Sequence, residues 1–139
     1  MGRINAGRVI LGGLLAGLVI NLGEFILNQL VLKTQWEAVM NALHLPPPGG
    51  GAIAWFVVSG FLGGILTVWL YAAFRPRLGP GPRTAIIAGL FVWALGCFLA
   101  LMPPMLTGVL PAQCVGTVMI WDLVEAPVAA VIGAWLYKE

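Results

Sequence analysis

The sequence predicts an all-α integral membrane protein, a bundle of four transmembrane helices. Hydrophobic residues make up 60% of the 139-residue chain and charged residues only 9%, and the mean hydropathy is +0.99. A soluble domain of this length has too little surface to accommodate so much apolar area. Four apolar segments reach or approach the roughly 20 residues that a helix needs to span a bilayer. They are residues 9–32, 52–74, 84–102 and 115–137, which we expect to form a single domain.

Positive charge gathers on one side of the predicted bundle. Of the seven Lys and Arg residues, only Lys33 lies in an outer loop. Cytoplasmic loops of membrane proteins carry an excess of Lys and Arg, so both termini are expected to be cytoplasmic. We expect a multi-pass protein of a bacterial-type inner (plasma) membrane. The remaining positive residues are Arg3, Arg8, Arg75, Arg77, Arg83 and Lys138.

The first apolar segment carries polar side chains inside its membrane-spanning length. Asn21, Glu24 and Asn28 follow an i, i+3, i+7 spacing, which places them on one side of a helix. A carboxylate near the middle of a membrane costs about 2.5–3.5 kcal/mol on insertion scales, so it rarely faces lipid. These three residues therefore form the first half of a predicted intramembrane polar cluster.

The first outer loop is expected to contain a short helix. Thr34 and Glu37 fit a capping box, with Thr34 as N-cap. An apolar stripe follows at helical spacing, and it allows two interpretations: a lid over the outer mouth, or an interfacial helix that lies on the membrane. The Pro-Pro-Pro-Gly-Gly-Gly run 46–51 must end this helix. The stripe consists of Trp36, Val39, Met40 and Leu43.

The later segments suggest an internal repeat. A shift of 66 positions aligns Trp55 with Trp121 and Trp69 with Trp135, without a gap. The first and third segments align more weakly. Because both halves begin on the cytoplasmic side, this would be a parallel repeat of two helical hairpins. The third segment is expected to end at Pro103-Pro104.

The fourth segment supplies the second half of the polar cluster. Asp122 and Glu125 lie three residues apart on one helical face, which Ala129 and Gly133 extend with small side chains. Counting about 1.5 Å per residue places Asp122 at the depth of Glu24, and Glu125 at the depth of Asn21. The first and fourth helices are therefore expected to face each other. Pro127 is expected to kink the fourth helix.

None of the four apolar segments contains a Lys, Arg or His, so the three acids have no basic partner within them. Three solutions remain open. The acids are protonated and hydrogen-bond to carboxamides or backbone as polar glue between helices, or they bind a cation or line a hydrated path, or another subunit supplies a base.

No catalytic, cofactor or metal site is predicted. His44 is alone in a loop, and Ser59 has no intramembrane base to activate it. Outer methionines would suit Cu(I), but only the pair Met102 and Met105 is closely spaced. Cys97 and the loop residue Cys114 are expected to be free thiols.

We expect a non-enzymatic structural or accessory subunit, or an oligomeric scaffold, of a membrane complex. Its partners would be the lipid bilayer and further copies of the chain or other membrane subunits, without nucleic acid. The alternative is a small transporter or channel-like protein with an intramembrane carboxylate site for a cation or proton. The four-helix layout, with its Trp-bearing outer helix, resembles several families of small bacterial inner-membrane proteins. That resemblance covers layout alone and implies no activity.

Overall fold

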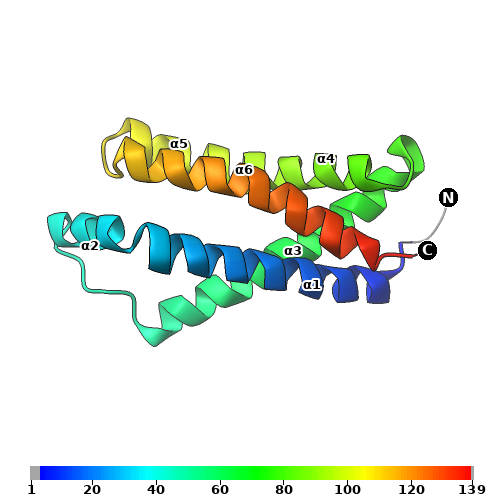
Figure 1. Cartoon of the computed structure of the whole chain (residues 1–139), viewed down its shortest axis with the longest axis horizontal. Coiled ribbons are helices and arrows are strands. Elements are labelled where there is room, and N and C mark those ends of the chain that lie inside the picture. The colour runs from blue at the N-terminus through cyan, green and yellow to red at the C-terminus, as the bar shows by residue number, and fades with distance from the viewer. Residues whose placement is uncertain (1–3, 139) are drawn as a thin grey trace.

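A computed structural model describes residues 4–138 and is all-helical, with 84% helix and no strand in this part of the chain. Figure 1 shows long helices running alongside one another, with both termini at one end and α2 at the other. The elements are α1 (Ala6–Phe25), the π-helical η1 (Ile26–Val31), α2 (Lys33–Ala42), α3 (Gly50–Leu78), α4 (Pro82–Trp93), the π-helical η2 (Ala94–Phe98), α5 (Leu99–Leu106) and α6 (Ala112–Trp135).

Four continuous helical stretches are long and apolar enough to cross a membrane: α1 with η1, α3, α4 through α5, and α6. The prediction of four membrane-length helices is therefore confirmed, and they indicate a multi-pass membrane protein. The stretches are longer than predicted because helix continues into the connecting loops, including the basic ones. Arg8, Arg75, Arg77 and Arg83 consequently lie within the ends of helices.

Glycines allow α1 and α3 to pack at backbone contact. A methyl group at Gly13 would collide with the backbone of Ile65, and one at Gly64 would collide with the backbones of Gly13 and Gly17. Small residues spaced four apart permit this close approach. In lipid the hydrophobic effect does not drive helices together, so van der Waals contacts between closely packed helices stabilise the pair instead. The small-residue spacings of both helices thus have a structural use.

Helix α6 packs against α1 and α4 in the same way. A Cβ at Gly133 would lie 2.7 Å from the Gly12 carbonyl oxygen and 2.8 Å from the Ala16 Cβ. A Cβ at Gly89 of α4 would lie 2.7 Å from the carbonyl oxygen of Ala126. Beside these contacts lies a core of small and medium apolar side chains, including Val68, Ala72, Ala85, Ala88, Ala129 and Ala130.

The end of the bundle that carries the termini is closed by two tyrosines and an arginine. The rings of Tyr71 and Tyr137 meet edge to face with centroids 6.0 Å apart, and the Arg75 guanidinium carbon lies 5.9 and 5.3 Å from them. The Tyr137 hydroxyl accepts a hydrogen bond from the Asn5 N–H, and that of Tyr71 accepts one from Gly81, both at 3.3 Å. These contacts join α1, α3, the α3–α4 loop and the C-terminus.

The predicted start of the outer-loop helix was wrong. Helix α2 begins at Lys33, with Leu32 as N-cap and no side-chain capping bond, so Thr34 is already helical. The reason is that η1 continues the first helix to Val31, and the Leu32 N–H bonds to the Leu27 carbonyl at 2.8 Å. That i to i−5 bond carries the chain directly into α2.

Prolines act differently in the third and fourth segments. The prediction that helix ends at Pro103-Pro104 was wrong: α5 continues to Leu106, because the proline φ suits a helix, and the Thr107 N–H still bonds to the Pro103 carbonyl at 3.0 Å. Pro127 lies inside α6, which bends partway along its length (Figure 1). The missing Pro127 N–H removes the helical partner of the Leu123 carbonyl, which accounts for a bend.

Adjacent glycines of α3 provide a direct test of the α1–α3 contact. We expect Gly64→Ala to lower the free energy of unfolding by about 1–3 kcal/mol, because its methyl group must displace the α1 backbone. Gly63→Ala is the matched control, since nothing lies within 4 Å of its added Cβ. Reversible unfolding in mixed micelles measures both, and equal effects would contradict this packing.

Candidate functional site

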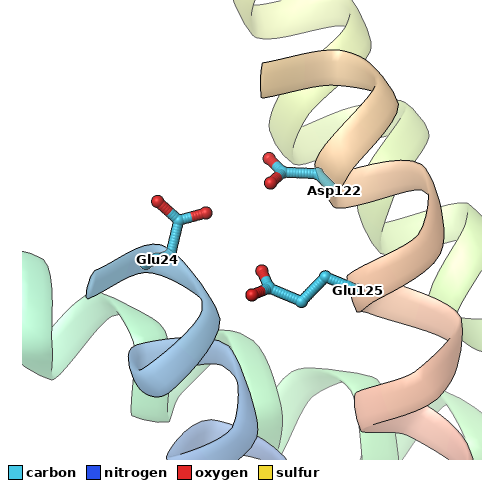
Figure 2. A group of neighbouring side chains, drawn as sticks. All are labelled: Glu24, Asp122 and Glu125. Atoms are coloured by element: carbon cyan, nitrogen blue, oxygen red, sulfur yellow. The ribbon is translucent and has the colours of Figure 1, made fainter. Parts of the chain in front are cut away.

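Three acidic side chains meet between α1 and α6. Glu24 of α1 faces Asp122 and Glu125 of α6, as Figure 2 shows, and one carboxylate oxygen of each lies within 4.8 Å of the others. All three side chains are partly buried. We call Glu24, Asp122 and Glu125 the three-carboxylate cluster.

The cluster forms because of residue spacing on α6 and because α6 packs closely against α1. The i, i+3 spacing places Asp122 and Glu125 on the face of α6 that continues to Gly133, where α6 crosses α1 at close range. Gly23 then leaves room for the incoming side chain, because a Cβ at Gly23 would occupy the position of the Glu125 carboxyl. The residue next to Glu24 thus admits Glu125 to the cluster.

A chain of hydrogen bonds holds Glu24 from the end of the bundle that carries α2. The side-chain NH₂ of Asn28 donates to the Glu24 carboxylate at 2.7 Å and to the Glu24 main-chain carbonyl at 2.9 Å. The Asn28 side-chain oxygen accepts the indole N–H of Trp36 at 2.8 Å. Glu24 is thereby linked to α2 through two side chains.

The hydrogen bond to Glu125 on α6 is longer than the one to Glu24. The Trp121 indole N–H donates to Glu125 at 3.3 Å, one turn away on the same helix. Oδ1 of Asp122 is buried and has no hydrogen-bond partner within residues 4–138. The thiol of Cys97, in η2, lies beside the Asp122 carboxyl. Cys97 and Cys114 are both free and buried, as the sequence predicted.

Asn21 does not share this space. Its side-chain NH₂ donates to the Gly17 carbonyl at 2.9 Å and to the Val57 carbonyl of α3 at 3.2 Å. Its amide also fills the space above Gly60, where an added Cβ would lie 2.7 Å from the Asn21 nitrogen. Of the five residues expected to form the polar cluster, the structure brings four together, and the fifth joins α1 to α3.

Sequence reasoning missed four residues around the site: Gly23, Trp36, Trp121 and Cys97. Each of the two tryptophans donates its indole N–H to a side chain of the site. The i, i+4 spacing of Trp121 and Glu125 was a usable signal. No local pattern connects Trp36 to Asn28. Trp93 also packs in the bundle, and its indole N–H donates to the Met119 carbonyl at 3.0 Å.

Electrostatically, the cluster is one-sided. The charged groups that act on each glutamate are other carboxyls of the cluster, and none of the groups that perturb the three acids, within residues 4–138, is basic. Two unit charges at 4.8 Å repel by about 3.5 kcal/mol at an effective dielectric constant near 20. Three bare carboxylates in this position would therefore be strongly unfavourable, and the cluster needs protons, a cation or a basic group from a partner to neutralise it.

The donor set is suited to a hard cation. Carboxylate oxygens are the ligands that Ca²⁺ prefers, at about 2.3–2.6 Å, so opposite ligands lie about 5 Å apart. The 4.8 Å limit of the cluster fits that span. The residues that could hold such an ion are Glu24, Asp122 and Glu125, through their carboxylates. Asn28, whose amide accepts from Trp36, donates to Glu24 beside them.

Fold and site together define a class: a multi-pass helical membrane protein with a carboxylate cluster between two spanning helices. In comparisons with protein-family models, with curated proteins and with solved structures, the chain matches none of them. Function must therefore be argued from the site itself.

Paired substitutions at Glu24 test the hydrogen-bond chain. Glu24→Gln keeps an acceptor for Asn28, so we expect little loss of stability. Glu24→Leu leaves the Asn28 NH₂ short of a partner and should lower the free energy of unfolding by about 1–3 kcal/mol. The same two changes at Glu37, exposed on α2, are the controls. Equal stability of the two Glu24 variants would contradict the contact.

Proposed function

We propose that the three-carboxylate cluster is an intramembrane binding site for a cation or protons, and that the chain is a small non-enzymatic transporter or channel-like protein. One observation carries this proposal: carboxyls of two spanning helices converge within 4.8 Å, and within residues 4–138 the charged groups that act on the glutamates are these carboxyls alone. Ionisable residues inside a membrane usually mark ion pathways or proton relays. The geometry thus favours the alternative over the accessory-subunit hypothesis as the main function.

Charge balance suggests how such a site would work. A divalent cation bound by three carboxylates leaves one negative charge, which a single proton on the cluster would neutralise. Release of the cation then favours uptake of two further protons, because repulsion among bare carboxylates is costly at this distance. Exchange of protons for a cation therefore keeps the cluster neutral in both states.

The buried oxygen of Asp122 supports a binding role. A polar atom buried without a hydrogen bond costs about 1–3 kcal/mol, so it needs a proton, a water molecule or an ion as partner. Trp121 and Asn28 already donate to the two glutamates. We propose that Asp122 is the carboxyl that most directly takes up the transported species.

We further propose that the protein lies in a bacterial-type inner membrane with cytoplasmic termini. The support is the concentration of Lys and Arg at the end that carries the termini.

We also propose that the chain is a parallel repeat of two helical hairpins. In its favour, α1 packs on α3 and α4 packs on α6, and the opening helix of each half contains a π-helical segment, η1 and η2.

Flux measurements in proteoliposomes test the transport proposal. With a pH-sensitive dye and a Ca²⁺-sensitive dye inside, we expect the wild-type protein to carry protons, Ca²⁺ or both. Glu24→Gln and Asp122→Asn each remove an ionisable ligand and should reduce flux to that of protein-free vesicles. Glu37→Gln, on the exposed face of α2, should retain it. Equal flux in all four proteins, or none in the wild type, would remove the proposal.

A second candidate function remains the oligomeric or accessory role. It is favoured by one feature of α3: its first ten residues, from Gly50 to Ser59, are all exposed, with Trp55 and Phe56 each more than 60% exposed. Gly63 on the same helix is also uncovered. Small residues on a spanning helix are typical of contacts with another helix.

The mass of the protein in lipid nanodiscs decides this candidate. An oligomer or accessory subunit should purify as more than one chain or with a membrane partner, and Gly63→Leu should reduce that association, because it blocks close helix approach. Leu62→Ala, at an exposed position of the same helix, is the control. A single chain without a partner would contradict the second candidate and leave the transport proposal intact.

A further inference from the structure

Helix α2 reaches the three-carboxylate cluster through a defined pair of contacts. Trp36 lies on α2, outside the spanning part of α1, yet its indole N–H donates to Asn28 at 2.8 Å, and Asn28 donates to Glu24 at 2.7 Å. An outer-loop helix is thus connected to an intramembrane acid by two hydrogen bonds.

The direction of these bonds fixes the Asn28 amide. An indole N–H can only donate, so Asn28 must turn its oxygen toward Trp36. Its NH₂ group then points at Glu24, where it serves both the main-chain carbonyl and the carboxylate. The opposite orientation would place two donors together at Trp36 and two acceptors together at Glu24. Trp36 therefore determines that Glu24 meets a donor.

Helix α2 is seated on the protein along the stripe that contains Trp36. Val39 is 8% exposed and Trp36 is partly buried, whereas Leu43 at the end of the stripe is 42% exposed. This supports the lid interpretation, because most of the stripe turns toward the protein. The helix lies between the η1 segment and a connection rich in Pro and Gly, residues 43–49, so both of its attachments interrupt regular α-helix.

We propose that Trp36 is a positioning residue for Glu24, acting through the orientation of the Asn28 amide, and that the seating of α2 thereby regulates the three-carboxylate cluster. This inference rests on the proposed function of the cluster. When α2 is seated, Glu24 is held toward Asp122 and Glu125 with one oxygen bonded. When α2 lifts, Asn28 loses its oriented partner, and Glu24 is free to turn away.

The titratable groups that face Glu24 are few. They are Asp122 and Glu125 from α6 and the Cys97 thiol from η2. A change at Trp36 alters none of them directly. Any effect of Trp36 on the pH dependence of transport must therefore pass through Asn28 and Glu24.

The test is a double-mutant cycle read by the pH dependence of proton flux in proteoliposomes. We expect Trp36→Phe, which keeps the ring and removes the N–H, to move the midpoint of the pH profile by about half a unit or more. In an Asn28→Leu background the same change should have no further effect, because the connection is already broken. Trp55→Phe, at an exposed indole of α3, is the matched control and should leave the profile unchanged.

Trp36 emission provides a readout that does not depend on transport. Subtraction of the Trp36→Phe spectrum from the wild-type spectrum gives the emission of Trp36. We expect this emission to change with pH when Glu24 is present and not to change with pH in proteins that carry Glu24→Gln. An unchanged flux profile in Trp36→Phe, or a Trp36 emission that ignores Glu24→Gln, would overturn the inference. If the wild type shows no flux while Trp36 emission still follows Glu24, the transport proposal fails and the positioning contact stands.

Discussion

The proximity of three carboxyls inside a membrane-spanning bundle is the constraint on which the account depends. Glu24, Asp122 and Glu125 approach within 4.8 Å, and in the part of the chain that the structure describes no basic group acts on them. Ionised together, they would repel and lose hydration; neutralised by protons or a cation, they join α1 to α6. A fold can retain such a cluster only if the two helices are held together elsewhere, and backbone-level contacts at Gly12 and Gly133 join α1 and α6 further along the bundle.

The closest helix packing and the proposed site lie toward different ends of the bundle. Close glycine contacts, the small-residue core and the Tyr71–Arg75–Tyr137 group lie toward the end that carries the termini. Toward the other end α3 is exposed, the helices contain π segments, and α2 connects to the cluster. π segments within α-helices frequently lie at functional sites. Under the proposed function, one end supplies the close packing, and the other supplies the site with α2 beside it.

The helices and the meeting of the acids could be predicted because they depend on local quantities. Apolar length defines a span, the i, i+3 spacing places Asp122 and Glu125 on one face of their helix, and the residue count places Asp122 at the depth of Glu24. The roles of Gly23 and Trp36 depend instead on where α6 crosses α1 and how α2 folds back, which packing determines. Packing also decides that Asn21 bonds to α3 and not to the cluster, because the rotation of α1 about its axis determines which neighbouring helix each side chain contacts.

Infrared spectroscopy of the carboxyl bands, recorded during pH and Ca²⁺ titration, tests the cluster most directly. Groups this close must titrate as a coupled set. The account predicts that Glu24→Gln changes the bands and midpoints of Asp122 and Glu125, and that Asp122→Asn does the same to both glutamates. Three independent titrations, each unaffected by substitution of the other two acids, would show that the carboxyls do not share one space and would contradict the account.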